Sequence, residues 1–452
     1  MDDPRDQRIA ELEAENAELR RRIAQLEHQL QQFLQRHKRA KGKRQLRQGT
    51  LADRRRKEHR KHPGVFRPEP PPDTAFVEHD VHPKQCTHCG SADLEATGRF
   101  EDHIVADIPE PKLEWHRYRR HIYQCRCCQH TCQGRGDLEL PGAHIGPRAR
   151  LLTCYGRAHL GISLGKTRDL LHDFFGLTVS RAGLLGHLRW GGTLFEPVVE
   201  ELLERLRTSP VVQGDETGWR LNGQLAWAWC FRDPTLALFL IDRHRSSDVI
   251  ARVLGPSFAG TLVSDFYAAY NGLNCPKQRC LVHLLRELAK LREELPAPSV
   301  RAFIQPLLTL FQDAIQLGKD RAAMSPRAFD RAHQAVLDRY DDLMVNCHSQ
   351  HRDCLRIWRR LFKHGGELFT FLNDPQVPAD NNGCERDIRS LAAARNDGGT
   401  HRAEWSATAF ARIKSVIVTG LKNGLRFIHY GMEVVQAKLQ GQPPPLPLAD
   451  AA

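Results

Sequence analysis

The sequence has no apolar run approaching the ~20 residues that a membrane-spanning helix needs. Its first residues, MDDPRDQRIAELEAE, lack the basic segment followed by an apolar segment that marks a secretory signal. Acidic residues are in the minority, with 54 Asp and Glu against 66 Lys and Arg and a formal charge of +12. We therefore expect no membrane span and a cytoplasmic location. The charge favours a polyanionic partner, either nucleic acid or an anionic membrane surface.

The number of cysteines is odd, at 13, and the chain is far larger than the small secreted domains that depend on disulfides. A disulfide framework is therefore not expected. Five of the cysteines lie within residues 86–128, where Cys86 and Cys89 form one Cys-x-x-Cys pair and Cys125 and Cys128 another. Four thiolates complete a tetrahedral Zn²⁺ site. We predict a four-cysteine structural zinc domain over 80–135, with strands of a zinc ribbon such as 121–124.

The fourth zinc ligand is uncertain by one position. Other residues with ligand chemistry lie nearby: Cys127, Cys132, His88 and His130. Buried cysteines without a metal are the alternative interpretation.

Residues 5–36 form a heptad repeat that predicts a coiled coil, with apolar residues at the a and d positions except Asn16 and attractive pairs between the g and e positions. Asn16 at an a position favours a parallel dimer in fixed register. The alternative is one amphipathic helix packed on the chain's own core. A basic and Pro-rich stretch follows at 37–79, which we interpret as a linker able to contact phosphates, although a merely solvated linker has the same composition.

Residues 140–208 have helical periodicity, with helices expected at 147–160, at 166–175 and from an N-capping Ser180 to about Trp190. A short turn at 176–179 joins the last two, as in a helix-turn-helix. In that arrangement Arg181, His187 and Arg189 would face DNA. The alternative is a set of ordinary packing helices.

A core domain with strand-like alternation begins at Val211 and extends over 209–430. A short apolar strand ends at Asp215, and the Asn222-Gly223 turn predicts a hairpin leading to strands at 225–231 and 236–241. After a helix over 246–254, a second apolar strand ends at Asp265. Two parallel strands that each end in an acid would bring both carboxylates to one edge of a sheet.

Phosphoryl transfer by two divalent cations needs a third hard oxygen ligand. Asp380, Glu385 and Asp387 lie at the start of a predicted helix that Asn382 could cap, and spacing alone leaves the choice among the three acids open. A surface carboxylate or helix cap is the ordinary role of any one such acid.

The joint motif set resembles the transposases of the insertion-sequence-66 family. The motifs that carry the resemblance are DETGW at 215–219, LVSD at 262–265, YAAY at 267–270 and Asn-Asn-x-x-Glu-Arg at 381–386. The resemblance implies a multidomain α/β protein with an RNase H-like mixed-sheet DDE core and an all-α insertion at 281–378. It implies Asp215, Asp265 and Glu385 as the catalytic acids and the ligands of Mg²⁺ or Mn²⁺. It also suggests companion proteins from the same element.

The sequence departs from the family pattern in two places. Cys280-x-x-His283 matches a family signature, but Leu281 stands where Trp is common. We interpret this pair as a support element of the active site or as a core histidine, because no second half of a zinc site lies nearby in the sequence. The run 394–400 also differs, which leaves open whether Arg395, His401 and Arg402 contact DNA as expected of that region.

We therefore predict a transposase that cleaves the ends of a mobile element and joins the 3′-hydroxyl ends to target DNA. Its partners would be double-stranded DNA and further copies of the chain, as a homodimer or higher oligomer. The alternatives are a non-catalytic zinc-containing DNA-binding regulator and a metal-dependent nuclease of the same fold. Residues 431–452 are expected to form a C-terminal tail.

Overall fold

The computed structural model describes residues 70–295, 297–347 and 349–448. The chain divides into two compact units, Met1–Val105 and Ala106–Ala452. The predicted coiled coil at 5–36 and most of the predicted linker lie outside the described residues. Residues 70–105 of the first unit contain turns but no helix or strand. No helix in the described part of the chain is long and apolar enough to cross a membrane.

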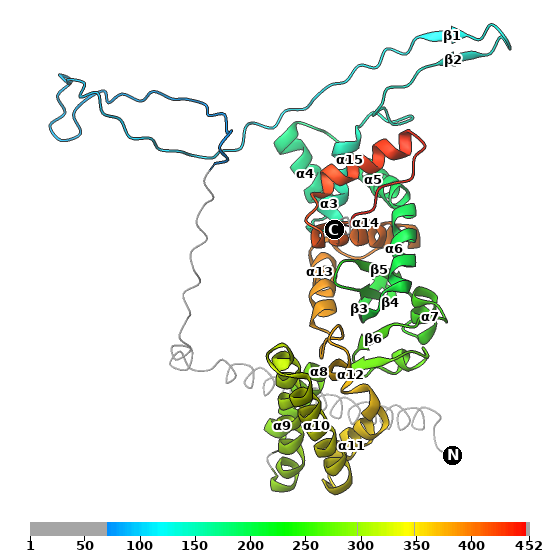
Figure 1. Ribbon diagram of the computed structural model, residues 1–452. Coiled ribbons are helices and arrows are strands. Elements are labelled where there is room, and N and C mark those ends of the chain that lie inside the picture. The colour runs from blue at the N-terminus through cyan, green and yellow to red at the C-terminus, as the bar shows by residue number, and fades with distance from the viewer. Residues whose placement is uncertain (1–69, 296, 348, 449–452) are drawn as a thin grey trace, which may run out of the picture. The chain divides into compact units, whose positions relative to one another are not determined.

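The second unit contains a five-stranded mixed sheet with the strand order β5–β4–β3–β6–β7 (Figure 1). The strands are β3 (Val211–Leu221), β4 (Gln224–Arg232), β5 (Ala237–Asp242), β6 (Thr261–Ser264) and β7 (Lys277–Arg279). Strands β3, β4 and β5 are antiparallel neighbours, whereas β6 and β7 run parallel to β3. The predicted strands and hairpin are confirmed, but β7 was not predicted, because three residues are too few to display an alternating pattern.

Strand β3 is longer than the sequence suggested. Asp215 does not end it, because the strand continues to Leu221 and pairs with β4 throughout. The turn at Asn222 and Gly223, with φ of 52° and 75°, closes this long hairpin as the Asn-Gly pair predicted. Pairing with β6 covers only Val211–Gln213. Asp215 therefore lies just beyond the parallel part of β3, near the start of its antiparallel part.

Four helices precede the sheet. They are α3 (Pro147–Ala158), α4 (Leu164–Phe175), α5 (Arg181–Leu194) and α6 (Glu196–Thr208). Ser180 caps α5 as predicted, since its Oγ accepts a hydrogen bond from the Gly183 amide at 3.1 Å. Helix α5 continues beyond Trp190 through Gly191 and Gly192. A Cβ at these glycines would lie 2.6 Å from Cys154 Sγ and 2.5 Å from the Ala409 Cβ, so they permit close helix packing and do not end the helix.

The remaining helices of this part flank the sheet or follow it. They are α7 (Ser247–Leu254), α13 (Asn382–Gly398), α14 (Glu404–Lys422) and α15 (Phe427–Leu439). Leu188 of α5, Trp229 of β4, Phe410 of α14 and Val434 of α15 belong to one buried cluster. The helices of 140–208 thus share a core with the sheet. The predicted C-terminal tail at 431–452 begins inside α15, whose apolar face is buried. The first part of that range is therefore helical and packed.

The segment between β7 and α13 is helical, as predicted for the insertion. Its helices are α8 (Leu281–Glu294), α9 (Pro298–Asp320), α10 (Pro326–Asn346), α11 (Arg352–His364) and α12 (Thr370–Asn373). These helices have a hydrophobic cluster of their own, which Val263 of β6 also joins. In Figure 1, α9, α10 and α11 lie together, apart from the helices around α14.

Candidate active site

Asp215 and Asp265 lie at equivalent positions on neighbouring parallel strands. Gln213 of β3 is paired with Val263 of β6, so each acid comes two residues after a paired position and the two lie on the same face of the sheet. Asp265 directly follows β6, and its Oδ1 accepts a hydrogen bond from the Tyr267 amide at 2.8 Å. The predicted parallel pairing of the strands that carry these two acids is confirmed, although Asp215 lies within β3 and not at its end.

Arg279 holds the chain around Asp265, a role that sequence reasoning missed. Its side chain is fully buried and its Nε forms an ion pair with Glu367 at 2.6 Å. Its Nη1 donates to the Asp265 carbonyl at 2.9 Å and to Ser264 Oγ at 3.2 Å. Because Arg279 is in the unpredicted strand β7, only the sheet order reveals that it adjoins the second acid.

Glu385 lies in the first turn of α13, and the start of this helix is fixed to β3. Asn381 Nδ2 donates to the Gly214 carbonyl at 2.8 Å, and Gln213 Nε2 donates to the Asp380 carbonyl at 3.1 Å. A Cβ at Gly383 would lie 2.4 Å from Gln213 Oε1, so glycine permits this close approach. The Asn-Asn-Gly-Cys run thereby brings Glu385 beside the strand that carries Asp215.

The other two acids at this helix have different partners. Asp387 forms ion pairs with Lys422 Nζ at 3.0 Å and Arg232 Nε at 3.4 Å. The Asp380 carboxylate accepts the Asn382 amide at 2.9 Å. The prediction that Asn382 caps the helix is wrong, because Asn382 is already helical and the capping position belongs to Asn381, whose side chain bonds to β3 instead.

The electrostatics of Asp215 reflect a concentration of negative charge. The pKa of Asp215 is raised to about 7, first by burial and then by the charges of Glu216, Asp265 and Glu385, against a lowering hydrogen bond from the Glu216 amide. Among the described residues, neither Asp215 nor Asp265 has a cation within ion-pair distance. Carboxylates that repel one another in this way form a site for cations.

Glu216 is a buried acid that sequence reasoning did not single out. Burial raises its pKa overall, although hydrogen bonds from Tyr270 and Arg245 oppose that rise. Tyr270 donates to Glu216 Oε2 at 2.6 Å, and Arg245 pairs with Oε1 at 2.6 Å. The Arg245 guanidinium lies 3.8 Å from the ring centroid of Tyr267, whose hydroxyl donates to the Arg245 carbonyl. Tyr270 and Tyr267 of the YAAY motif therefore help to hold Glu216, beside Asp215, against a hydroxyl and the Arg245 guanidinium.

Cations and the Cys-x-x-His pair adjoin Glu385. Arg286 Nη1, Arg389 Nη2 and His283 Nε2 lie 3.4, 3.5 and 3.6 Å from its carboxylate oxygens. Cys280 is buried, which raises the pKa of its thiol to about 11. Its backbone amide donates to the Ser264 carbonyl at 2.8 Å, and its Sγ accepts the amide of Asn381, the N-cap of α13, at 3.2 Å. Cys280 thus connects the strand before the second acid with the helix of the third.

The residues predicted to contact DNA differ in exposure. Arg181 and Arg402 are exposed, and the exposed Arg189 stacks on Trp405 at 4.3 Å. Arg395 is half-buried and donates to the Gly218 carbonyl of β3. Its guanidinium thus braces α13 against the sheet.

Two histidines considered for DNA contact are internal. His187 is buried and its Nδ1 lies 3.0 Å from Thr153 Oγ1, and the buried His401 stacks on Trp219. The interpretation of His187 as facing DNA is wrong, because His187 lies on the core side of its helix; His401, for which the question was open, is buried as well.

The two cysteine pairs have matching local turns. The Cys86 amide donates to the Ser91 carbonyl, and the Cys125 amide donates to the His130 carbonyl, both at 2.8 Å. Hydrogen bonds from backbone amides lower the pKa of both Cys86 and Cys125, which favours the thiolate that zinc needs. Cys125 also lies in the turn between β1 (Ile122–Gln124) and β2 (Thr131–Gln133), so the predicted strand at 121–124 is confirmed.

The two pairs lie in different units, and each is described by itself. The zinc site that would join Cys86 and Cys89 to Cys125 and Cys128 therefore remains a prediction.

Comparison with known families agrees with this geometry. A model of the IS66 family of transposases matches residues 145–409, which is more than half of the chain and includes all three candidate acids. The chain belongs to the IS66 transposase family. A second model, the zinc-finger binding domain of transposase IS66, matches residues 83–129, which include both Cys-x-x-Cys pairs of this IS66-family chain.

A curated relative of this IS66-family chain comes from Sinorhizobium fredii (strain NBRC 101917 / NGR234). It is described as uncharacterized protein y4jD and is 24% identical over 385 residues. The similarity covers 75% of this chain and 72% of the relative. It extends well beyond any single motif.

Proposed function

We propose that this chain is a DDE transposase that cleaves phosphodiester bonds at the ends of a mobile element and joins the 3′-hydroxyl ends to target DNA. The observation that carries the proposal is the convergence of Asp215, Asp265 and Glu385 from β3, β6 and α13. The raised pKa of Asp215 supports it, because its physical cause includes the charges of the other two acids. Family membership supports the same conclusion.

An RNase H-like core is part of this proposal. The sheet order β5–β4–β3–β6–β7, with a long hairpin followed by two parallel strands, supports it. Such an arrangement presents two acids from adjacent strands on one face, and a helix after the sheet adds the third.

The side chains present fit divalent cations such as Mg²⁺ or Mn²⁺, because all three acids offer hard oxygen ligands. Cations bound there would activate the attacking water or 3′-hydroxyl and stabilise the leaving oxygen. Arg279 fixes the backbone of Asp265, and Asn381 fixes the helix of Glu385. The side chains of Arg286 and Arg389, beside Glu385, offer positive charge to the phosphates of a bound DNA strand.

Other parts of the proposed function involve DNA and further copies of the chain. Zn²⁺ bound by Cys86, Cys89, Cys125 and Cys128 would order the domain at 80–135 for binding element ends. A dimer through residues 5–36 would bring two ends together.

The test uses the DNA that flanks the coding region as the substrate. With Mg²⁺, we expect the full-length protein to cleave this DNA at specific positions and to join a pre-cut end to a second duplex. Asp215→Asn, Asp265→Asn and Glu385→Gln should each lower cleavage at least ~100-fold, as expected when a group that acts in the transition state is removed. Asp380→Asn is the matched control, because an amide oxygen at residue 380 can still accept the Asn382 amide.

The outcomes separate the candidate functions. Cleavage without joining would identify a nuclease, and specific DNA binding with neither reaction would identify a regulator. Full activity of Glu385→Gln would refute the third acid.

A further inference from the structure

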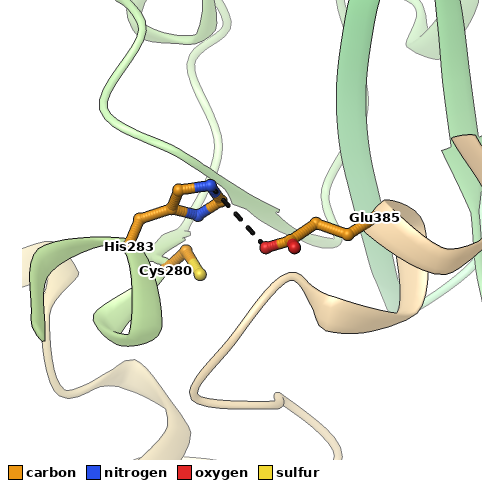
Figure 2. Close-up of side chains that lie close together, drawn as sticks. All are labelled: Cys280, His283 and Glu385. Carbon is orange, nitrogen blue, oxygen red and sulfur yellow. Dashed lines mark ion pairs between the residues drawn. The ribbon is translucent and has the colours of Figure 1, made fainter. Parts of the chain in front are cut away.

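Cys280, His283 and Glu385 form a cluster of three metal-ligand side chains at the edge of the candidate active site. Cys280 immediately precedes α8, His283 lies in its first turn, and Glu385 comes from α13. One ligand atom from each residue lies within 4.8 Å of the other two. In Figure 2 the cysteine and histidine side chains lie beside the Glu385 carboxylate. The third ligand, Glu385, lies 102 residues after His283 in the sequence, so sequence spacing alone did not reveal it.

The atoms of this cluster are prepared for a metal. His283 Nδ1 is buried and has no hydrogen-bond partner among the described residues. Cys280 Sγ accepts a hydrogen bond from the Asn381 amide at 3.2 Å. Burial raises the pKa of the free thiol, so a metal must displace the thiol proton, and this amide then stabilises the bound thiolate. Ligands at about 2.0–2.3 Å from a tetrahedral zinc ion lie about 3.5 Å apart, so small side-chain rotations would complete the site.

We propose that Cys280, His283 and Glu385 bind one Zn²⁺ ion, separate from the four-cysteine zinc domain, with an open fourth position for water. A thiolate with an imidazole selects zinc over magnesium, because soft and borderline ligands bind Mg²⁺ poorly. Binding replaces the thiol proton of Cys280 with the metal and releases that proton to solvent.

This zinc site would act as a brake on the neighbouring chemistry, an extension that rests on the proposed function. Glu385 is the residue that the two sites share. When its carboxylate is bound to zinc beside Cys280 and His283, it is less available to Asp215 and Asp265. Zinc would therefore inhibit the Mg²⁺-dependent reaction by competing for Glu385.

The binding test uses Co²⁺ as a spectroscopic probe for zinc in the full-length protein, with zinc kept in the four-cysteine domain and removed from the Cys280 site by brief chelation. We expect Co²⁺ to produce thiolate-to-cobalt charge-transfer absorption that Zn²⁺ displaces. Cys280→Ser should abolish this signal. The His283 side chain is 38% exposed, so we expect His283→Gln to fold normally. This variant should weaken Co²⁺ binding at least ~10-fold, because losing a metal ligand weakens binding at least as much as losing a hydrogen bond that supports the ligand. Cys275→Ser is the matched thiol control and should keep the signal.

Equal Co²⁺ spectra and affinities for the wild type, Cys280→Ser and His283→Gln would overturn the site. If Cys280→Ser does not fold, His283→Gln decides the same question. The activity test measures the rate of Mg²⁺-dependent cleavage with and without added zinc, in the wild type and in His283→Gln. If zinc inhibits the wild type but not His283→Gln, the result supports the brake. Equal inhibition of the wild type and His283→Gln refutes it. A wild type that never cleaves DNA refutes the proposed function, whereas the Co²⁺ spectra still decide the zinc site.

Discussion

Replacement of Asp215 by Asn should stabilise the metal-free protein while abolishing its activity. The carboxylate of Asp215 is largely buried among the charges of Glu216, Asp265 and Glu385, and its pKa rises from 3.8 to about 7. A rise from 3.8 to about 7 corresponds to at most about 4 kcal/mol lost from the free energy of unfolding above pH 7. Because solvent and counter-ions reach the site, we expect the variant to gain about 1–3 kcal/mol at pH 8.

The pH dependence of this gain has a defined sign. The folded protein holds the Asp215 proton more tightly than the unfolded chain does, so the stabilisation is fully present below pH 3.8 and is lost as the pH rises through about 7. Asn has no proton to lose, and its Oδ1 can still accept the Glu216 amide. The difference between variant and wild type should therefore shrink steadily from pH 8 to pH 4.

The assay is urea unfolding followed by the fluorescence of buried tryptophans such as Trp219 and Trp229. Asp387→Asn is the control, since it removes an acid that is paired with Arg232 and Lys422 and should lose about 1–3 kcal/mol. Adding Mg²⁺ should stabilise the wild type and have little effect on Asp215→Asn. The reasoning is refuted if both variants lose stability at pH 8, or if the gain of Asp215→Asn does not depend on pH.

Three further predictions concern other parts of the chain. Burial lowers the pKa of His187 to about 4, so its stabilising contribution is present above pH 6.5 and is lost as the pH falls through 4. In His187→Gln, the free energy of unfolding should therefore fall by about 1–3 kcal/mol less than in the wild type as the pH is lowered through this range. Cys86→Ser should remove one equivalent of zinc per chain by elemental analysis, and an unchanged zinc content would argue against the four-cysteine site. Arg402→Ala should weaken DNA binding and reduce its salt dependence without lowering thermal stability, whereas Arg395→Ala should lower the melting temperature because Arg395 braces Gly218.

The order of elements in the core could be predicted from the sequence. Apolar alternation and the Asn-Gly turn indicated β3, β4 and β5, and Ser180 marked the start of α5. These signals are local, since each depends on a few neighbouring residues. The long extension of β3 and the continuation of α5 through two glycines could not be predicted, because both depend on partners distant in the sequence.

The candidate acids were predicted unequally for a similar reason. Asp215 and Asp265 each follow an apolar run, so the run identifies the acid. Glu385 has no such signal, and only the resemblance to a family separated it from Asp380 and Asp387. In the structure their contacts differ, since Asp387 is paired with cations of the core, whereas Glu385 is paired with the exposed Arg286 and Arg389 and its charge helps to raise the pKa of Asp215.

The contacts that sequence reasoning could not predict share one property, which is that they connect segments distant in the chain. Arg279 joins β7 to the Asp265 backbone, and Asn381 joins α13 to Gly214 of β3. Cys280 Sγ accepts the Asn381 amide, so the start of the helical insertion and the start of the Glu385 helix meet at one sulfur atom. Because the insertion separates Asp265 from Glu385 along the chain, contacts of this kind must set how closely those two acids approach. A change at Cys280 should therefore affect metal binding by the acids even though Cys280 lies outside them, and the Co²⁺ and Mg²⁺ titrations of Cys280→Ser measure that coupling directly.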